Sequence, residues 1–150
     1  MQVKKPVAQP LACITPEAVQ AALDAALKKA QDLDVAVNIA LVDNAGHLAG
    51  FIRQVGAFLH SIDIAIDKAY TAVSFGLPTV QWHEALQKDS VAVREGIVRR
   101  ARFVGFGGGL PIVLDGQRIG GIGVSGASEA QDGMIAQAGL DAIVALAVGA

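Results

Sequence analysis

Four residues of this sequence carry the chemistry that a small-molecule site needs: Arg53, His60, Lys68 and Asp132. An arginine guanidinium can hold a carboxylate through two parallel hydrogen bonds. Histidine suits proton transfer because its ordinary pKa lies near neutrality, and His60 follows the kind of variable loop that carries function. We therefore predict His60, Lys68 and Asp132 as candidate catalytic groups and Arg53 as a candidate ligand-binding group.

Three of these residues also have a structural alternative. Arg53 could be a surface residue of an edge strand, and Lys68 could form a salt bridge from its otherwise apolar helix. Asp132 falls in the first turn of a predicted helix, where an acid interacts favourably with the helix dipole. The sequence contains no recognisable Ser-His-Asp arrangement and no His-Glu-x-x-His motif.

Glycines form a second group of candidate site residues. The stretch GIGVSG at 121–126 matches the Gly-x-Gly-x-x-Gly pattern of dinucleotide-binding turns. Such a turn needs a parallel strand after its helix, and here we expect the helix to be the last element. We therefore interpret the glycines as marks of a bent sheet, or of a surface that a flat ligand or a partner subunit approaches closely. The backbone of Gly107, Gly108 and Gly109 would offer N–H donors to a carboxylate.

The composition predicts a single globular domain. Of 150 residues, 53% are hydrophobic and 17% charged, and the net charge is -2. The short basic run at 99–102 does not provide the broad basic surface that a nucleic-acid partner requires. Cys13 is the lone cysteine, so neither an internal disulfide nor a cysteine metal site is expected. With no apparent signal peptide or membrane span, we expect a cytoplasmic protein with no membrane partner.

Periodicity and turn chemistry predict the elements that position these residues. The predicted helices cover 16–32, 61–75, 80–88 and 129 to the end of the chain, with caps at Thr15, Ser61, Thr79 and Ser128. The predicted strands cover 35–42, 47–54, a stretch from 103 onward, 110–114 and 118–124. Residues 1–14 are predicted as an N-terminal arm, and residues 89–102 as a loop with one helical turn.

The turns between the predicted strands define the fold class. Turn residues at 43–46 and at 115–117 join neighbouring strands into hairpins. We therefore predict an α+β domain over residues 15–150, with a mainly antiparallel sheet of about five strands flanked by helices.

Three longer blocks share a further pattern: ALVDNAGHLAGFIRQVGA at 40–57, SIDIAIDKAYTAVSFGLPT at 61–79, and GGGLPIVLDGQRIGGIGVSGASEAQDGMIAQAGL at 107–140. In this order and spacing they resemble the GlcG/HbpS family of haem-binding-like proteins, whose domain also occurs at the C-terminal end of PduO-type cobalamin adenosyltransferases. The resemblance implies a profilin-like fold that assembles into dimers or larger homo-oligomers such as octamers. It also implies haem as a cofactor of some members, with no settled activity for others.

The resemblance bears on individual residues as well. It implies a haem contact for the threonine at Thr79, and His83, four residues later, could share a helical face with it and ligate iron. Alternatively, Thr79 only caps a helix and His83 is a solvated side chain. The lysine at Lys68 recurs in the family pattern, whereas an acidic residue common after the second strand is missing here. Residues 82–106 look individual to this sequence.

Two main functions stay open from the sequence. The first is an oligomeric small-ligand-binding protein of a catabolic or stress-related pathway, with haem among its candidate ligands. The second is a cofactor-free lyase, hydratase or isomerase that binds a small carboxylate in an inter-subunit pocket and moves protons through the candidate catalytic groups. An assembly module without ligand chemistry is a third interpretation.

Overall fold

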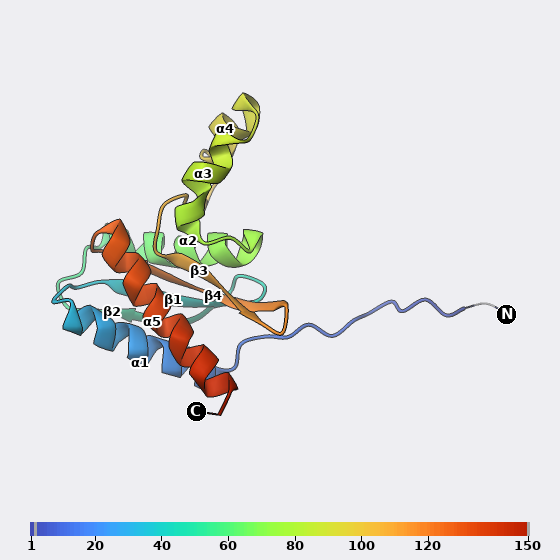
Figure 1. Ribbon diagram of the computed structural model, residues 1–150, viewed down its shortest axis with the longest axis horizontal. Helices are drawn as coiled ribbons and strands as arrows, with labels where there is room; N and C mark the ends of the chain where they lie inside the picture. Colours follow the sequence, from blue (N-terminus) through green and yellow to red (C-terminus); the bar gives the residue numbers. More distant parts are fainter. Residues whose placement is uncertain (2, 150) are drawn as a thin grey trace.

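The computed structural model describes residue 1 and residues 3–149, and its centre is a four-stranded sheet (Figure 1). The strands are β1 (Asn38–Asp43), β2 (Leu48–Arg53), β3 (Gly109–Leu114) and β4 (Gln117–Ser125). They lie in the order β2–β1–β4–β3, and every neighbouring pair is antiparallel. The prediction of an antiparallel α+β domain is confirmed, with four strands in place of about five.

The expected strand from residue 103 is a loop instead. Residues 103–108 have no strand conformation, and β3 begins only at Gly109. Gly108 has a φ of 123°, which breaks an extended run. The Gly107 N–H donates to Oε1 of Glu129 at 2.7 Å, so it bonds to a side chain where a strand would bond to a neighbouring strand.

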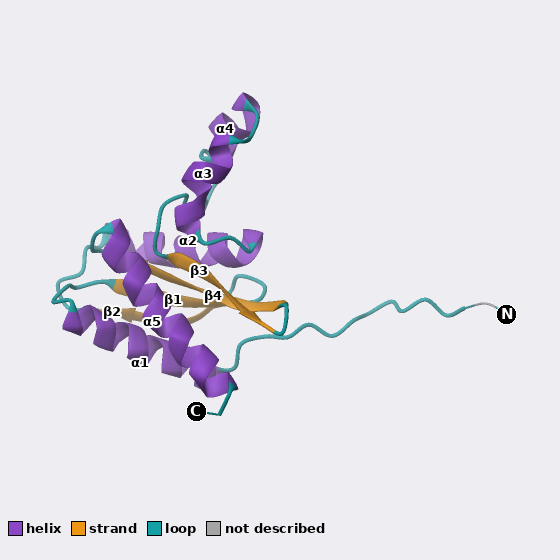
Figure 2. Ribbon diagram, viewed as in Figure 1, coloured by secondary structure: helices purple, strands orange, loops and turns teal. Residues whose placement is uncertain are grey.

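Helices cover both faces of the sheet (Figure 2). Their bounds are Pro16–Asp32 for α1, His60–Phe75 for α2, Trp82–Gln87 for α3, Val91–Ile97 for α4 and Glu129–Ala147 for α5, with a 3-10 turn, η1, at Thr79–Gln81. Helices α1 and α5 pack together on one face, and α2 lies on the other. Successive side chains of β1 point to opposite faces of the sheet and therefore enter different cores. Ile39 and Leu41 belong to the larger core, whereas Val42 packs against Ala69 and Val73 of α2.

Local cap signals account for several helix ends. Oγ1 of Thr15 accepts from the Ala18 N–H at 3.2 Å, and Ser128 forms a capping box with Gln131, so both predicted caps are confirmed. Helix α2 ends at the C-cap Gly76, whose φ of 67° is the left-handed conformation that glycine adopts easily.

Two other predicted caps are wrong. Helix α2 begins at His60 after Leu59, without a side-chain cap, and Ser61 is buried inside the first turn. Thr79 does not cap a helix either, because Pro78 precedes η1 and the Thr79 hydroxyl bonds across to Gly109.

The glycines of β4 make room for α2. A Cβ on Gly121 would lie 2.5 Å from the carbonyl oxygen of Ala69, and one on Gly123 would lie 2.5 Å from the Ala69 nitrogen. The strand and the helix backbone can approach this closely only without those side chains. The space opened by GIGVSG is therefore filled by a helix of the same chain.

Helices α3 and α4 form an arm that projects from the body of the domain (Figure 1). The segment 89–102, predicted as a loop with one helical turn, contains the seven-residue α4, whose N-cap Ser90 accepts from the Val93 N–H at 3.3 Å. At the base of the arm, the Trp82 ring packs edge-on against Phe75 and Phe103, with centroids 4.8 Å and 4.9 Å away. Aromatic packing thus fixes the point where the arm leaves the body.

Most of the N-terminal segment extends away from the helices and the sheet (Figure 1). Its last residues are bonded to the domain: the Ala12 N–H donates to Oε1 of Gln117 at 3.1 Å, the Ala12 carbonyl accepts from Nδ2 of Asn44 at 2.9 Å, and the Ile14 N–H donates to the Ile119 carbonyl at 2.9 Å. Among the described residues, no helix combines the length and the apolar character that crossing a bilayer demands.

Candidate functional site

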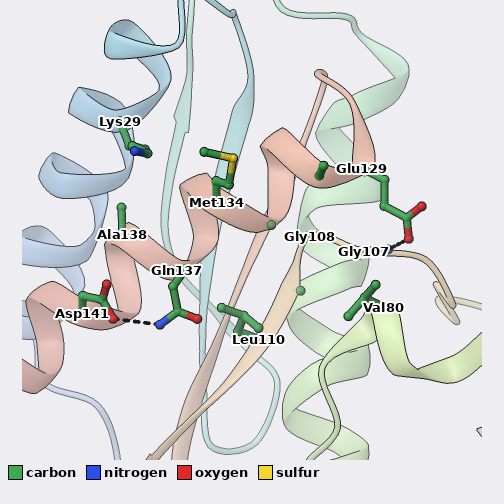
Figure 3. A pocket seen from close by; sticks show the side chains of 13 residues that line it. Lys29, Val80, Gly107, Gly108, Leu110, Glu129, Met134, Gln137, Ala138 and Asp141 are labelled. Carbon is green, nitrogen blue, oxygen red and sulfur yellow. Dashed lines mark hydrogen bonds between the residues drawn. The ribbon is translucent and has the colours of Figure 1, made fainter.

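A surface groove of about 740 Å³ follows α5 on the side of the glycine loop (Figure 3). Its lining comes from the last turn of α1, from η1, from the start of β3 and from α5. The lining residues are Lys29, Val80, Gly107, Gly108, Gly109, Leu110, Glu129, Ala130, Gly133, Met134, Gln137, Ala138 and Asp141. We call this the α5 groove, and its volume is in the range of small-molecule sites.

One face of α5 forms the long wall of the groove. Its lining residues recur every three to four positions from Ala130 to Asp141, so they share one side of the helix. The opposite side places Ile135, Gly139 and Ile143 in the core. The same helix therefore anchors the fold and lines the groove, where the small residues Ala130, Gly133 and Ala138 alternate with longer side chains, namely Glu129, Met134, Gln137 and Asp141.

The glycine loop forms the floor at one end. A Cβ on Gly108 would lie 2.5 Å from the Val124 carbonyl oxygen and 2.7 Å from Nζ of Lys68. A Cβ on Gly109 would lie 2.6 Å from the Lys68 carbonyl oxygen. Only glycine fits at both positions, which leaves bare backbone between the groove and the residues beneath it.

Two N–H groups of this loop already have partners. The Gly107 N–H donates to Glu129, and the Gly109 N–H donates to Oγ1 of Thr79 at 2.8 Å. The expectation that Gly107–Gly109 would act together as free N–H donors to a ligand carboxylate is therefore wrong. Their contribution to the groove is a flat surface held in place by Thr79 and Glu129.

Lys68 and Asp132 form a buried ion pair under the floor. Nζ of Lys68 lies 3.0 Å from Oδ2 of Asp132 and 2.7 Å from the Val124 carbonyl oxygen, and the two side chains are 1% and 4% exposed. Oδ1 of Asp132 accepts from the Ala127 N–H at 3.0 Å. The Phe106 ring lies over the ammonium, with its centroid 5.0 Å away. Every charged atom of the pair thus has a partner, as burial of charge demands.

Burial acts on both members of this pair in opposite directions. It lowers the pKa of the Lys68 ammonium, and the Asp132 charge opposes that shift. It raises the pKa of the Asp132 carboxyl, against the influence of Lys68 and of the backbone N–H groups of Ala127 and Gly126. The two pKa values are brought toward each other, which lowers the cost of moving a proton within the pair.

The structure brings together only some of the predicted site residues. Lys68 and Asp132 contact each other, Gly107, Gly108 and Gly109 line the groove, and Thr79 supports the floor from a fully buried position.

The remaining candidates lie outside the groove lining. Arg53 donates to the Ala57 carbonyl at 2.7 Å, which closes the loop after β2. His60 is an exposed residue at the start of α2, and exposed His83 pairs with Gln87 at 3.2 Å. Thr79 and His83 do not share a helical face, because Thr79 is fully buried in η1 whereas His83 is exposed on α3.

Sequence reasoning did not select Lys29, Glu129 or Met134. The signal that could have found the last two is the second periodic face of α5, distinct from the apolar face that packs on the sheet. Nothing in the sequence placed Lys29 of α1 beside that face.

Comparison with known proteins places the chain in a family. Residues 14–141 match the family model for haem degrading protein HbpS-like. An uncharacterized 15.0 kDa protein from the dhaT-dhaS intergenic region of Citrobacter freundii is 36% identical over 133 residues, or 89% of this chain and 94% of that protein. This chain belongs to the HbpS-like family, and the resemblance predicted from the sequence is confirmed.

Solved structures agree with this placement. The crystal structure of protein ORFY from Klebsiella pneumoniae has a TM-score of 0.87 at 34% identity, and the match covers 95% of this chain and 99% of that one. A PduOC–haem complex has a TM-score of 0.80 at 32% identity, covering 87% and 94%. The ORFY and PduOC matches each extend over most of this chain, so they agree on the fold of the whole domain.

Proposed function

We propose that this protein binds a flat, largely apolar ligand with carboxylate groups in the α5 groove, and that haem is this ligand. The observation that carries the proposal is the pairing of a bare glycine floor with three small residues of α5, Ala130, Gly133 and Ala138, between the polar side chains of that helix face. A planar ring can lie against such surfaces without displacing side chains. Membership of the HbpS-like family and the haem bound by a relative with the same fold support the choice of ligand.

The chemistry of the groove residues fits haem. Leu110, Val80 and Met134 supply apolar contacts, and Met134 also carries a thioether that can ligate iron. Lys29 is half-buried at the rim and takes part in no ion pair among the described residues, so its ammonium is available to a propionate. Bound haem would supply an iron centre, while the chain supplies the apolar surface, the counter-charge and the exclusion of water.

A glycine pair offers a clean test of the site. Gly133 lines the groove and a Cβ there would meet no atom within 4 Å, so the Gly133→Leu side chain starts in open space on the groove side of α5. Gly96 of α4 is also helical and equally unobstructed, so Gly96→Leu is the matched control. Both changes favour the helix.

The measurement is a titration of the protein with haemin, followed in the Soret band. We expect saturable binding, weakened about tenfold or more by Gly133→Leu and left unchanged by Gly96→Leu. Absence of saturable binding, or equal affinity of the two variants, contradicts the proposal.

A proton-transfer enzyme is the second candidate function, because the Lys68–Asp132 pair lies one backbone layer below the groove. Arg53 and His60 are outside the groove lining, so this alternative depends on the buried pair alone. Hydrogen–deuterium exchange next to the carboxylate of small 2-hydroxy and 2-oxo acids, followed by NMR in D₂O, tests it. Exchange above the buffer rate that disappears in Lys68→Met would favour the enzyme.

A further inference from the structure

We propose that Met134 is the iron ligand of the α5 groove, so that the site favours ferrous over ferric iron. The inference rests on the proposed function, since it assigns a role to a residue of the same groove. Met134 lies on the groove side of α5 and is 45% exposed. Because this long apolar side chain is partly exposed on the helix face, it is available to contact a ligand.

The surroundings of Met134 leave space around its sulfur. The adjacent Gly133 has no side chain, and Ala130 and Ala138, one turn before and after, carry only a methyl group each. Figure 3 shows the thioether projecting from α5, on the same side of the helix as Lys29. A macrocycle that places a carboxylate at Lys29 would therefore present its central region toward Met134.

The other groove residues are poorer ligands for haem iron. Glu129 already accepts the Gly107 N–H, and Asp141 accepts from Gln137 at 2.7 Å. Haem iron commonly takes histidine, cysteine, tyrosine or methionine. Among the described lining residues, methionine is the single member of that set.

Histidine, tyrosine and cysteine side chains of this chain lie away from the groove. His47 pairs with Asp43 at 3.3 Å, Tyr70 stacks under Arg102 at 3.6 Å, and Cys13 is an exposed residue before α1. None of these three side chains lines the α5 groove. The residues that line the groove therefore assign the role of iron ligand to Met134.

A thioether ligand has a chemical consequence that a carboxylate or imidazole would not have. Sulfur of methionine is a soft, neutral donor that stabilises the reduced state of haem iron and raises its reduction potential. Affinity for haem should thus depend on oxidation state, with ferrous haem held more tightly than ferric.

The experiment compares wild type, Met134→Leu and Met134→His with three probes: ferric haemin, ferrous haem under dithionite, and iron-free protoporphyrin. Leucine nearly matches the volume of methionine, so the apolar contact is kept while the donor is lost. We expect Met134→Leu to bind protoporphyrin as wild type does and to bind ferrous haem roughly ten- to a hundredfold more weakly. The sulfur-to-iron charge-transfer band and the raised reduction potential should also disappear, and Met134→His should show a histidine-ligated spectrum.

The three probes separate the failure of this inference from that of the proposed function. If wild type binds neither haem nor protoporphyrin, both fail. If wild type binds both and Met134→Leu keeps the wild-type spectrum, reduction potential and ferrous affinity, the groove stands and Met134 is not the ligand.

Discussion

The residues beneath the glycine loop and the residues of the α3–α4 arm occupy opposite environments. Lys68 and Asp132 are charged, yet they are buried and every charged atom has a partner. Val91, Val93 and Val98 are apolar, yet they are 56%, 44% and 53% exposed, and α4 has no buried residue. The two regions therefore differ in what holds them in place.

This difference separates long-range from local stabilisation. The buried pair joins α2 to α5 across 64 positions of sequence, so it exists only when the whole domain is folded. Helix α4 itself depends on the local Ser90 cap, and the base of the arm is held by aromatic contacts and by the bond from Nε of Arg102 to Oδ1 of Asp67 at 2.9 Å. Substitutions should accordingly be costly under the loop and mild on α4.

The largest effect is expected from breaking the ion pair. Lys68→Met leaves the Asp132 carboxylate buried without its counter-charge and should lower the free energy of unfolding by about 3–5 kcal/mol. Urea denaturation at neutral pH measures this. The double variant Lys68→Met, Asp132→Leu removes both charges and should recover most of the loss. A double variant as unstable as the single one would show that packing, and not charge, dominates.

A smaller loss of stability is expected from adding a side chain to the glycine loop that forms the groove floor. Gly108→Ala combines a φ of 123° with a Cβ only 2.5 Å from the Val124 carbonyl oxygen, and should cost about 2–4 kcal/mol. Gly116→Ala is the matched control, because its φ is 76° and its Cβ meets nothing within 4 Å. It should cost about 1 kcal/mol from the backbone alone. Equal losses in thermal or urea unfolding would contradict the tight fit of the floor.

The pH dependence of stability tests the burial of Lys68. Because burial lowers its folded-state pKa below 10.5, the unfolded chain binds a proton that the folded chain has lost between these two values. The free energy of unfolding must then rise with pH in that window. The difference in this free energy between wild type and Lys68→Met should therefore grow in favour of wild type as pH increases toward 10.5. Urea unfolding of both proteins at several alkaline pH values measures the difference. A constant difference would contradict the shift.

The smallest effect is expected on the arm. Val93→Ser in α4 removes an exposed methyl pair and should change the free energy of unfolding by less than about 0.5 kcal/mol. Val42→Ser, at a fully buried position of β1, is the contrasting variant and should be several times more damaging. A large loss from Val93→Ser in urea unfolding would mean that α4 is covered in solution.

Local signals in the sequence predicted much of this fold. The Thr15 cap, the Ser128–Gln131 capping box and the C-cap at Gly76 depend on residues within a few positions of one another. Both hairpins follow from turn residues between short apolar runs. Such features are readable because the interacting groups are neighbours in the chain.

The misassigned features depend on contacts between distant residues. The sequence of residues 103–108 favours a strand, but the Gly107 N–H bonds to Glu129, 22 positions away, and not to a neighbouring strand. Thr79 has the residue type of a helix cap, but its hydroxyl accepts a hydrogen bond from the Gly109 N–H, 30 positions away. Lys68 and Asp132 were each selected from the sequence, but their pairing required the packing of α2 and α5 across β4. Met134 and Lys29 were missed because a groove is a property of surfaces from several elements.

The thin floor at Gly108 links the groove to the proton balance of the protein. Glu129 stands at the groove, and its charge raises the pKa of Lys68 on the far side of the loop. A ligand that screens or neutralises Glu129 would weaken that influence and make Lys68 release its proton more readily. In the pH range where Lys68 titrates, binding would then release a proton to the solvent, and by reciprocity the affinity for ligand would vary with pH in that range. A single glycine without a side chain thus makes ligand occupancy and protonation two linked equilibria.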